Sequence, residues 1–531
     1  MPLALLPTTA DAYVLPKLLL LRAIVIVLAA GLLFEWARRR KFAWKRTSLD
    51  LPVVAFLASA ALSTVFAVNS NRAVFGAYAR YEGLVTIASY AALFWLSAQH
   101  MGGPDAARRV TRTLLVAACL VAFMGVAQTV VETSLQRPPG ESAFSFGGYY
   151  RATATFGNAN ALGAFLAMAL PLAVGELLVA RQASVRLMSG NACVIIGLGL
   201  LATFSRSAWL GGAAGIVVLL LTTRVSWRRL TVVGGIGVVI AVVAGVAILG
   251  NGPAPLSALR ARAASVFNLE TGSVATRWHI WTDTVQLVGS RPLLGYGPDT
   301  FGLVYPRFET GDWTPGYFID KAHSEVLQIA ATQGVLGVAA YCWLIVSAVI
   351  LFLRRSQSPG VPALFGAWLA YQVTVQFNFS YLPVTGPYWL LLAATVVTCD
   401  GVSEVHASIR PGLVRPLAGV GISALALATL PALIWPYQAN ASYFAALAYM
   451  ARTDQNGALS AIADSRRLAP YESVYAAAAG DIYLGLDAAD QPEPGANWAD
   501  AKASYLEAVR LGADDPAVYR HLSMAERGPG P

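Results

Sequence analysis

The sequence predicts an all-α polytopic membrane protein with about 12 transmembrane helices and a small helical tail. Of its 531 residues, 56% are hydrophobic and 13% are charged, whereas an ordinary soluble domain carries about 25% charged residues. Apolar runs of roughly 20 residues recur along the chain, the length that a helix needs to cross about 30 Å of hydrocarbon. Arginine and lysine gather in alternate loops, as is typical of cytoplasmic loops. The net charge of +9 therefore indicates membrane orientation and not nucleic-acid binding.

The first span is expected at about residues 14–34. The basic run ARRRKFAWKR follows it, which places this run in the cytoplasm and the N-terminus outside. Further spans are expected at about 51–68, 84–101, 111–131, 160–180, 187–204, 207–222, 230–250, 326–353, 361–378, 386–399 and 416–437. An even total returns the C-terminus to the outside.

The loops between these spans support the same orientation. Each predicted cytoplasmic loop carries at least two arginines near a span: Arg108, Arg109 and Arg112; Arg181 and Arg186; Arg224, Arg228 and Arg229; Arg354 and Arg355; Arg410 and Arg415. The outside loops hold fewer for their length, as the positive-inside rule requires. For the two short spans that flank Arg206, a re-entrant turn is the alternative.

Two domains are expected. Residues 1–437 form a transmembrane domain with a large extracytoplasmic loop at 251–325, and residues 438–531 form an extracytoplasmic tail. The tail resembles about two tetratricopeptide-like helical hairpins, because Gly480 and Tyr483, and then Ala501 and Tyr505, have the spacing of such repeats. An unrelated small helical tail is the alternative. A repeat tail would offer a groove to a protein partner.

Several classes of chemistry lack their sequence signatures. The chain has four cysteines without a CxxC pattern, no GxxxxGK[ST] phosphate loop and no G-x-S-x-G elbow. We therefore expect no metal and no cofactor. The substrate is expected to carry its own leaving group, and a lipid-linked diphosphate would be such a group.

The polar stretch from Arg277 to Gly337 is the first place to expect chemistry, because long apolar segments flank it. Arginines outside the membrane run against the topological bias. Arg206, in TFSRSAWLGG, lies at the outer surface, where a guanidinium binds phosphate bidentately; a snorkelling helix-end arginine is the alternative. Arg80 precedes Glu82 in ARYEGL, as a structural ion pair or as a ligand contact.

Two further outside positions are ambiguous in the same way. Arg151 opens RATATFGNANALGAF, in which Asn158 or Asn160 is expected to cap the next helix. Arg277 begins a helix whose Trp278 and Trp281 form an apolar face, so membrane-surface anchoring alone would explain that helix.

His323 is the best candidate for a general base. It lies just before the span at 326–353, and imidazole accepts protons near neutral pH. Glu325 and Asp320 are expected to orient it. An interfacial histidine bonded to a backbone carbonyl is the alternative, and His279 ranks lower.

The order of these motifs resembles the O-antigen ligase and polymerase family of bacterial envelopes. TFSRSAWLGG, TRWHIWTDTVQLVGSRPLLGYGPDTF and AHSEVLQIAATQGVLGVAAY carry the resemblance, with RYEGL and FGNANALGAFLA more loosely, across about residues 50–400. The resemblance implies a GT-C type glycosyltransferase of the bacterial inner membrane. Such an enzyme moves a glycan from an undecaprenyl-diphosphate carrier to an acceptor glycolipid, glycan or protein on the extracytoplasmic face, without metal or nucleotide.

The resemblance also assigns roles to residues. Arg206 and Arg277 match arginines thought to bind the carrier diphosphate, and His323 matches the histidine thought to activate the acceptor hydroxyl. The transfer to Arg80, Arg151 and Glu82 is looser, with Glu82 and Glu325 as supporting residues. A ligase is the first hypothesis, and a polymerase or a protein O-oligosaccharyltransferase are alternatives. A lipid-linked glycan transporter is less favoured, because a transporter places ionisable residues near the middle of its spans.

Overall fold

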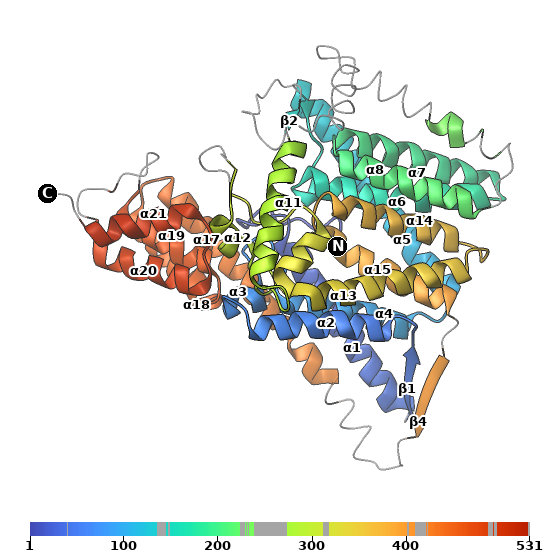
Figure 1. Cartoon of the computed structure of the whole chain (residues 1–531), viewed down its shortest axis with the longest axis horizontal. Helices are drawn as coiled ribbons and strands as arrows, with labels where there is room; N and C mark the ends of the chain where they lie inside the picture. Colours follow the sequence, from blue (N-terminus) through green and yellow to red (C-terminus); the bar gives the residue numbers. More distant parts are fainter. Residues whose placement is uncertain are drawn as a thin grey trace.

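The computed structural model consists of a bundle of long helices with a separate cluster of shorter helices at one end (Figure 1). It describes residues 1–39, 41–134, 145–146, 149–223, 229, 231, 233–237, 273–311, 318–400, 403–408, 421, 423–486, 492 and 496–528. The N-terminal residues lie within the bundle, and the C-terminal helix belongs to the separate cluster.

The bundle consists of α1 (Leu15–Arg39), α2 (Asp50–Val65), α4 (Leu84–His100), α5 (Pro104–Ser134), α6 (Ala159–Val179), α7 (Ala183–Ala202), α8 (Arg206–Thr222), α13 (Glu325–Arg354), α14 (Val361–Gln376) and α15 (Leu382–Cys399). By length and composition, α1, α5, α6, α7, α13 and α15 can each cross a membrane, and α2 and α8 are shorter apolar helices. The chain is thus a multi-pass membrane protein. Of the 12 predicted spans, 230–250 and the start of 416–437 lie largely outside the described residues.

Small residues set the closest contacts in the bundle. A Cβ atom on Gly211 of α8 would lie 2.4 Å from the Ala370 carbonyl oxygen of α14, and one on Gly215 would lie 2.4 Å from the Gly366 carbonyl oxygen. Glycine therefore lets α8 and α14 approach closely, as is typical of helix pairs in membranes. Nearly every side chain of the neighbouring α6 is buried.

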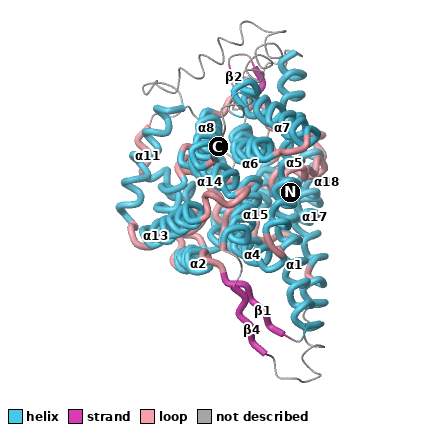
Figure 2. The backbone as a smooth tube through the Cα atoms, turned by 90° about the vertical axis from the view of Figure 1, so that its right-hand side faces the viewer, coloured by secondary structure: helices cyan, strands magenta, loops and turns pink. Residues whose placement is uncertain are grey.

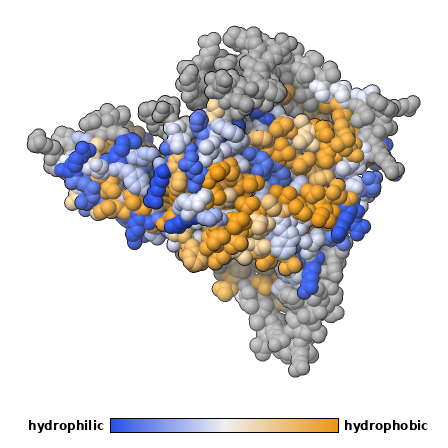
Figure 3. Space-filling view, viewed as in Figure 1, coloured by the Kyte–Doolittle hydropathy of each residue, from blue (hydrophilic) through white to orange (hydrophobic). Residues whose placement is uncertain are grey.

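The surface of the bundle matches a membrane protein. Apolar side chains cover a broad area over the long helices, whereas hydrophilic side chains gather over the tail and at the opposite end (Figure 3). Exposed apolar residues such as Leu51, Val65, Phe123 and Leu221 belong to these helices. An apolar belt between two polar ends is the surface that a bilayer requires.

The described residues are mostly helical, consistent with the predicted all-α membrane fold, and they also form two short β-ribbons. Strand β1 (Lys41–Arg46) pairs antiparallel with β4 (Ser403–Ser408), with Lys41 opposite Ser408, and β2 (Ser145–Phe146) pairs with β3 (Tyr149–Tyr150). The end of the predicted basic loop is therefore a strand. The backbone of Lys45 donates to Oε1 of Gln99 at 2.8 Å, which ties the β1–β4 ribbon to the end of α4 (Figure 2).

The polar stretch before α13 folds against that helix. It contains α11 (Ser273–Ser290), α12 (Phe301–Val304) and the 3₁₀ turn η2 (Tyr305–Arg307). Helix α13 is broken at Gly334, where φ is +66°. Residues 292–297 lie at this break: Tyr296 N–H donates to the Ala331 carbonyl at 3.0 Å and Val335 N–H donates to the Pro292 carbonyl at 2.8 Å. The break thus joins the polar stretch to the bundle.

The tail consists of helical hairpins. It contains α17 (Ile434–Met450), α18 (Gln455–Leu468), α19 (Ser473–Leu484), α20 (Trp498–Leu511) and α21 (Pro516–Arg527), and α17 packs on α18 as α19 packs on α20. Helix α17 begins four residues before the expected boundary at 438. A Cβ atom on Gly480 would lie 2.5 Å from the Tyr505 ring, so this glycine makes room for the tyrosine. Short 3₁₀ turns, η1 (Ala154–Phe156) and η3 (Leu430–Leu433), complete the described elements.

The tail docks on α3 (Ser70–Phe75), a short helix at the same end of the bundle as α11. Arg72 is buried and forms an ion pair with Asp514 of the tail. Its Nη1 donates to the Gly512 carbonyl at 2.8 Å, and its Nε donates to the Asp299 carbonyl at 2.9 Å. A single side chain therefore joins the tail, α3 and the polar stretch.

Candidate functional site

Arg80 lies in the turn between α3 and α4, against the segment that leads to α13. Its Nε is 2.6 Å from Oδ2 of Asp320. The guanidinium also lies over two aromatic rings that precede α15, at 5.2 Å from the centre of Phe379 and 5.6 Å from that of Tyr381. The ion pair that the sequence suggested between Arg80 and Glu82 does not form, because Asp320 takes that position. The ion pair thereby holds Arg80 against Asp320, which precedes His323 by three residues.

His323 lies beside the same aromatic ring. Its imidazole meets Phe379 edge-on at 5.3 Å between ring centres, and its backbone has a left-handed φ of +51°, which is uncommon for a residue other than glycine. Its buried Nδ1 has no hydrogen-bond partner among the described residues. Arg80 and His323, which belong to separate segments of the chain, therefore both contact the ring of Phe379.

Burial and positive surroundings keep this imidazole neutral. The pKa of His323 is lowered to about 4, first by burial and then by the charges of Arg277 and Arg80, against the opposing charge of Asp320. The expected orienting carboxylates have other partners: Asp320 binds Arg80, and Glu325 accepts the backbone N–H of Ser380 at 2.8 Å. His323 is therefore available as a proton acceptor at neutral pH.

Arg151 brings a third segment to this end of the bundle. Its Nε donates to the Thr203 carbonyl at 3.0 Å, just before α8 begins at Arg206, and its Nη2 donates to Oδ1 of Asn160 at 2.9 Å. Burial lowers the pKa of Arg151 to about 10, helped by the charges of Arg277 and Arg206. Arg277 and Arg206, from separate elements, thus both repel Arg151, and an anion would relieve that repulsion.

The two neighbouring asparagines, Asn158 and Asn160, have different hydrogen-bond partners. Oδ1 of Asn158 accepts the backbone N–H groups of Asn160 and Ala161 at 2.9 and 3.1 Å. The predicted cap of α6 is therefore confirmed at Asn158. Asn160 instead uses its side chain to hold Arg151.

Helix α11 carries Arg277 across the ends of the long helices (Figure 1). Ile280 and Leu287 are buried, whereas Trp278 and Val285 are 66% and 60% exposed. The Trp281 ring lies 6.4 Å from that of Phe377, just after α14. An exposed apolar stripe on a helix in this position is typical of a helix that lies along a membrane surface.

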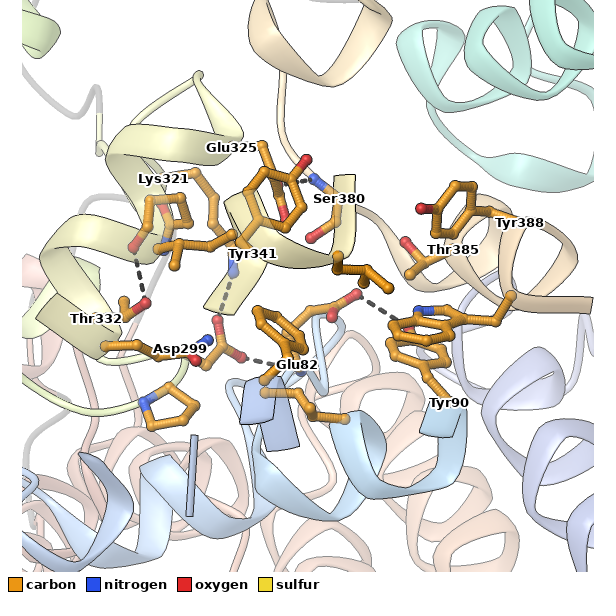
Figure 4. A pocket seen from close by; sticks show the side chains of 18 of the residues that line it. Glu82, Tyr90, Asp299, Lys321, Glu325, Thr332, Tyr341, Ser380, Thr385 and Tyr388 are labelled. Carbon is orange, nitrogen blue, oxygen red and sulfur yellow. Dashed lines mark hydrogen bonds and ion pairs between the residues drawn. The ribbon is translucent and has the colours of Figure 1, made fainter. Parts of the chain in front are cut away.

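Glu82 lies in a polar cavity between α2, α4, α13, α14 and α15 (Figure 4). Tyr90 donates to its Oε1 at 3.3 Å, and burial raises the pKa of Glu82 to about 8 against the charge of Lys321. The cavity of about 80 Å³ has room for several waters, each needing roughly 10–15 Å³, but not for a sugar. Glu82 and Glu325 both line this cavity.

The sequence reading missed the ion pair that fixes this region. Lys321 Nζ is 2.6 Å from Oδ1 of Asp299, and both side chains are almost wholly buried. Oδ2 of Asp299 accepts the backbone N–H of Ala77 at 2.7 Å and that of Glu82 at 3.2 Å. Burial alone would raise the pKa of Asp299, but Lys321 and Arg72 hold it below the ordinary value. The only sequence signal was the pair of charges within the polar stretch itself.

Comparison with known proteins agrees with this arrangement. Residues 191–342 match the profile of a family described as O-antigen ligase; this segment includes Arg206, Arg277 and His323. No curated protein matches the chain. The family is consistent with general ligase- or polymerase-like glycosyl transfer by a membrane enzyme. Over residues 191–342, the chain is therefore similar to the O-antigen ligase family.

Proposed function

We propose that the protein transfers a glycan from an undecaprenyl-diphosphate carrier to an acceptor hydroxyl on the extracytoplasmic face of the bacterial inner membrane. Arg206, Arg277 and Arg151 bind the diphosphate, Arg80 lines the same site, and His323 is the general base. A fold of the GT-C type and a tetratricopeptide-like tail belong to this proposal. The carrier diphosphate supplies the leaving group, so we propose a reaction that needs no metal or cofactor.

The observation that carries the proposal is the convergence of cations and one neutral histidine at a single end of the bundle. Arg80 and His323 both contact Phe379, Arg277 lowers the pKa of His323, and Arg151 is held beside the start of α8. Each comes from a different segment of the chain. A diphosphate between the arginines would place the sugar carbon that it activates within reach of the imidazole.

The reaction follows from these positions. The acceptor oxygen forms a bond to the anomeric carbon as the bond from that carbon to the phosphate oxygen breaks, and the diphosphate leaves with the electron pair. The imidazole of His323 takes the proton from the acceptor hydroxyl. The arginines stabilise the negative charge that develops on the leaving group. The cavity that Glu82 lines, of about 80 Å³, is too small for the glycan, which therefore binds outside this cavity.

Ligase, polymerase and protein glycosyltransferase differ only in the acceptor. The helical tail lies next to the site through Arg72 and Asp514, which favours an acceptor or partner large enough to contact both. A transporter is less favoured, because the arginines and the histidine gather at one end of the bundle and do not line a path through it.

Reconstitution tests the proposal. The full-length protein in liposomes with undecaprenyl-diphosphate glycan is expected to release undecaprenyl diphosphate only when an acceptor is added, and the modified acceptor identifies the branch. If the protein releases no carrier but moves labelled lipid between leaflets, it is a transporter and the proposal fails.

A further inference from the structure

A second cavity lies at the end of the bundle that is opposite to the candidate site. It has a volume of about 600 Å³ and lies between the ends of α5, α6, α14 and α15. Along α6, Glu176 in the cavity lining lies about 24 Å from Asn160 at the candidate site. The volume is within the roughly 300–1,000 Å³ that is typical of small-molecule sites, whereas the function proposed above makes no use of this cavity.

The lining of this cavity is basic. Arg108 and Arg112 reach it from the first turns of α5, and Arg181 from the turn after α6; among the described residues, Glu176 is the only acidic one in the lining. Three arginines against one glutamate leave a net charge of +2. The positive end of the α14 dipole adds to this charge, because Gly360 and the first turn of α14 also line the cavity.

The cations are only partly neutralised by the protein. Arg112 lies 3.2 Å from the mostly buried Glu176. Arg108 is 4.0 Å from Asp105, a carboxylate that is 88% exposed, so solvent screens this pair strongly. Arg181 has no ion pair among the described residues. Ordinary positive-inside arginines are spread along the membrane surface, but these three converge on one hollow.

The inner wall of the cavity is apolar. Leu172 and Val179 of α6 and Leu364 of α14 line it, and of these Val179 is 58% exposed whereas Leu172 and Leu364 are buried. The expected ligand therefore carries a negative charge at one end and hydrocarbon at the other. Guanidinium groups bind phosphate oxygens bidentately, and basic hollows between membrane helices suit phospholipid head groups.

We propose that this cavity binds the head group of an anionic phospholipid, with Arg108, Arg112 and Arg181 around its phosphodiester. The acyl chains leave the cavity past the exposed Val179. The occupied site ties the end of α5 to the ends of α6 and α14. This proposal requires only that the bundle spans a bilayer, and it is independent of the reaction at the other end.

Lipid retention tests the site. Full-length protein is reconstituted in nanodiscs of equal phosphatidylglycerol and phosphatidylcholine, extracted into detergent, and its bound lipid is measured by native mass spectrometry. We expect retained phosphatidylglycerol in excess. In the double variant Arg112→Gln/Arg181→Gln, the excess is expected to fall about fivefold for each arginine removed. The matched control Arg109→Gln/Arg186→Gln removes the same charge from α5 and from the first turn of α7, at residues that do not line the cavity, and is expected to keep the excess.

Three outcomes would overturn the proposal: no excess in the wild type, an unchanged excess in the cavity variant, or an equal loss in the control. A separate arm distinguishes a soluble ligand. If inorganic phosphate without lipid raises the thermal unfolding temperature as much as phosphatidylglycerol does, the cavity binds a soluble anion and the lipid assignment is wrong. Size-exclusion profiles of both double variants show whether they are folded.

Discussion

His323 is a neutral base in positive surroundings, and this sets its pH dependence. Its pKa is lowered to about 4, first by burial and then by Arg277, so the imidazole is unprotonated above that pH. We expect kcat/KM, which reports the free enzyme, to fall only toward pH 4. In the pH profile of kcat, which reports the enzyme with bound substrate, the fall on the acid side should lie at higher pH, because the bound diphosphate offsets the charge of Arg277. Initial rates of carrier release across pH 4–8 measure both.

Arg277→Gln provides the decisive comparison for this pKa. Removing the neighbouring charge should move the kcat/KM limb toward pH 6.5, the ordinary value for histidine. Arg291→Gln is the matched control, because Arg291 lies over Tyr296 at 4.8 Å and is not among the groups that shift His323. A wild-type limb at pH 6.5, or one that Arg277→Gln leaves unmoved, would contradict the account.

Glu82 is expected to act as a neutral acid and not as a charge. Its pKa is raised to about 8 by burial, so Glu82→Gln should leave transfer at pH 7 unchanged. Folded Glu82 keeps its proton between pH 4.5 and 8, where the unfolded chain loses it, so this group lowers stability as pH rises through that window. The unfolding temperature of wild type should therefore fall relative to Glu82→Gln from pH 5 to pH 8. A loss of transfer in Glu82→Gln at pH 7 would show that the carboxylate itself is needed.

Residue chemistry and position relative to the spans were enough to select Arg80, Arg151 and His323, which the structure places at one end of the bundle. They were not enough to find partners. Asp299 and Lys321 are 22 residues apart with no shared period, and only the fold brings their charges to 2.6 Å. Glu82 follows Arg80 by two residues, whereas Asp320 is 240 residues away in the chain, and only the packing of the fold shows that Asp320 is the partner of Arg80.

At the scale of elements, the break in α13 determines how the polar stretch meets the bundle. Gly334 has φ +66°, and a Cβ atom there would lie 2.3 Å from the Leu293 backbone. Gly334→Ala should lower the free energy of unfolding by at least about 3 kcal/mol through backbone strain and this clash. It should also reduce transfer, because the polar stretch leads to His323. Thermal unfolding in detergent measures the first effect.

Gly289→Ala is the control for this prediction. Gly289 lies in exposed α11, where a Cβ atom would meet nothing within 4 Å, so alanine should stabilise the protein by about 0.5 kcal/mol. Equal effects of the two substitutions would show that the break is not a structural requirement.

The elements themselves were largely predictable. Apolar length alone placed α6 and α14 within two residues of their observed ends, because a span is a repeated and local pattern. The break at Gly334 was missed, since GVLGVAAY is continuously apolar and nothing local marks residues 292–297 as its partner. The β1–β4 ribbon was missed because its strands are about 360 residues apart in the chain.

At the scale of the whole molecule, Arg72 holds the tail against the site. Arg72→Gln removes a buried charge from Asp514 and the hydrogen bonds to the Gly512 and Asp299 carbonyls. Breaking such a pair costs about 3–5 kcal/mol. The tail should then become sensitive to limited proteolysis while the bundle stays resistant, and transfer should fall because Asp299 loses support.

Arg466→Gln is the control within the tail. Arg466 pairs with Glu507, and both side chains are about one-third exposed, so its loss should cost at most about 1 kcal/mol. Proteolysis of the tail that is no faster in Arg72→Gln than in Arg466→Gln would contradict the docking role. Sequence could not reveal this contact, because Arg72 and Asp514 are 442 residues apart and neither lies in a recognisable motif.

The central claim is that His323 accepts the proton of the acceptor as the carrier diphosphate departs. Acceptor-dependent release of undecaprenyl diphosphate by His323→Ala in liposomes tests it most directly, with carrier binding measured on the same preparation. The account predicts that release falls by about 10²–10⁴-fold while carrier binding, which depends on the arginines, is retained. Release at the wild-type rate by folded His323→Ala protein would contradict it.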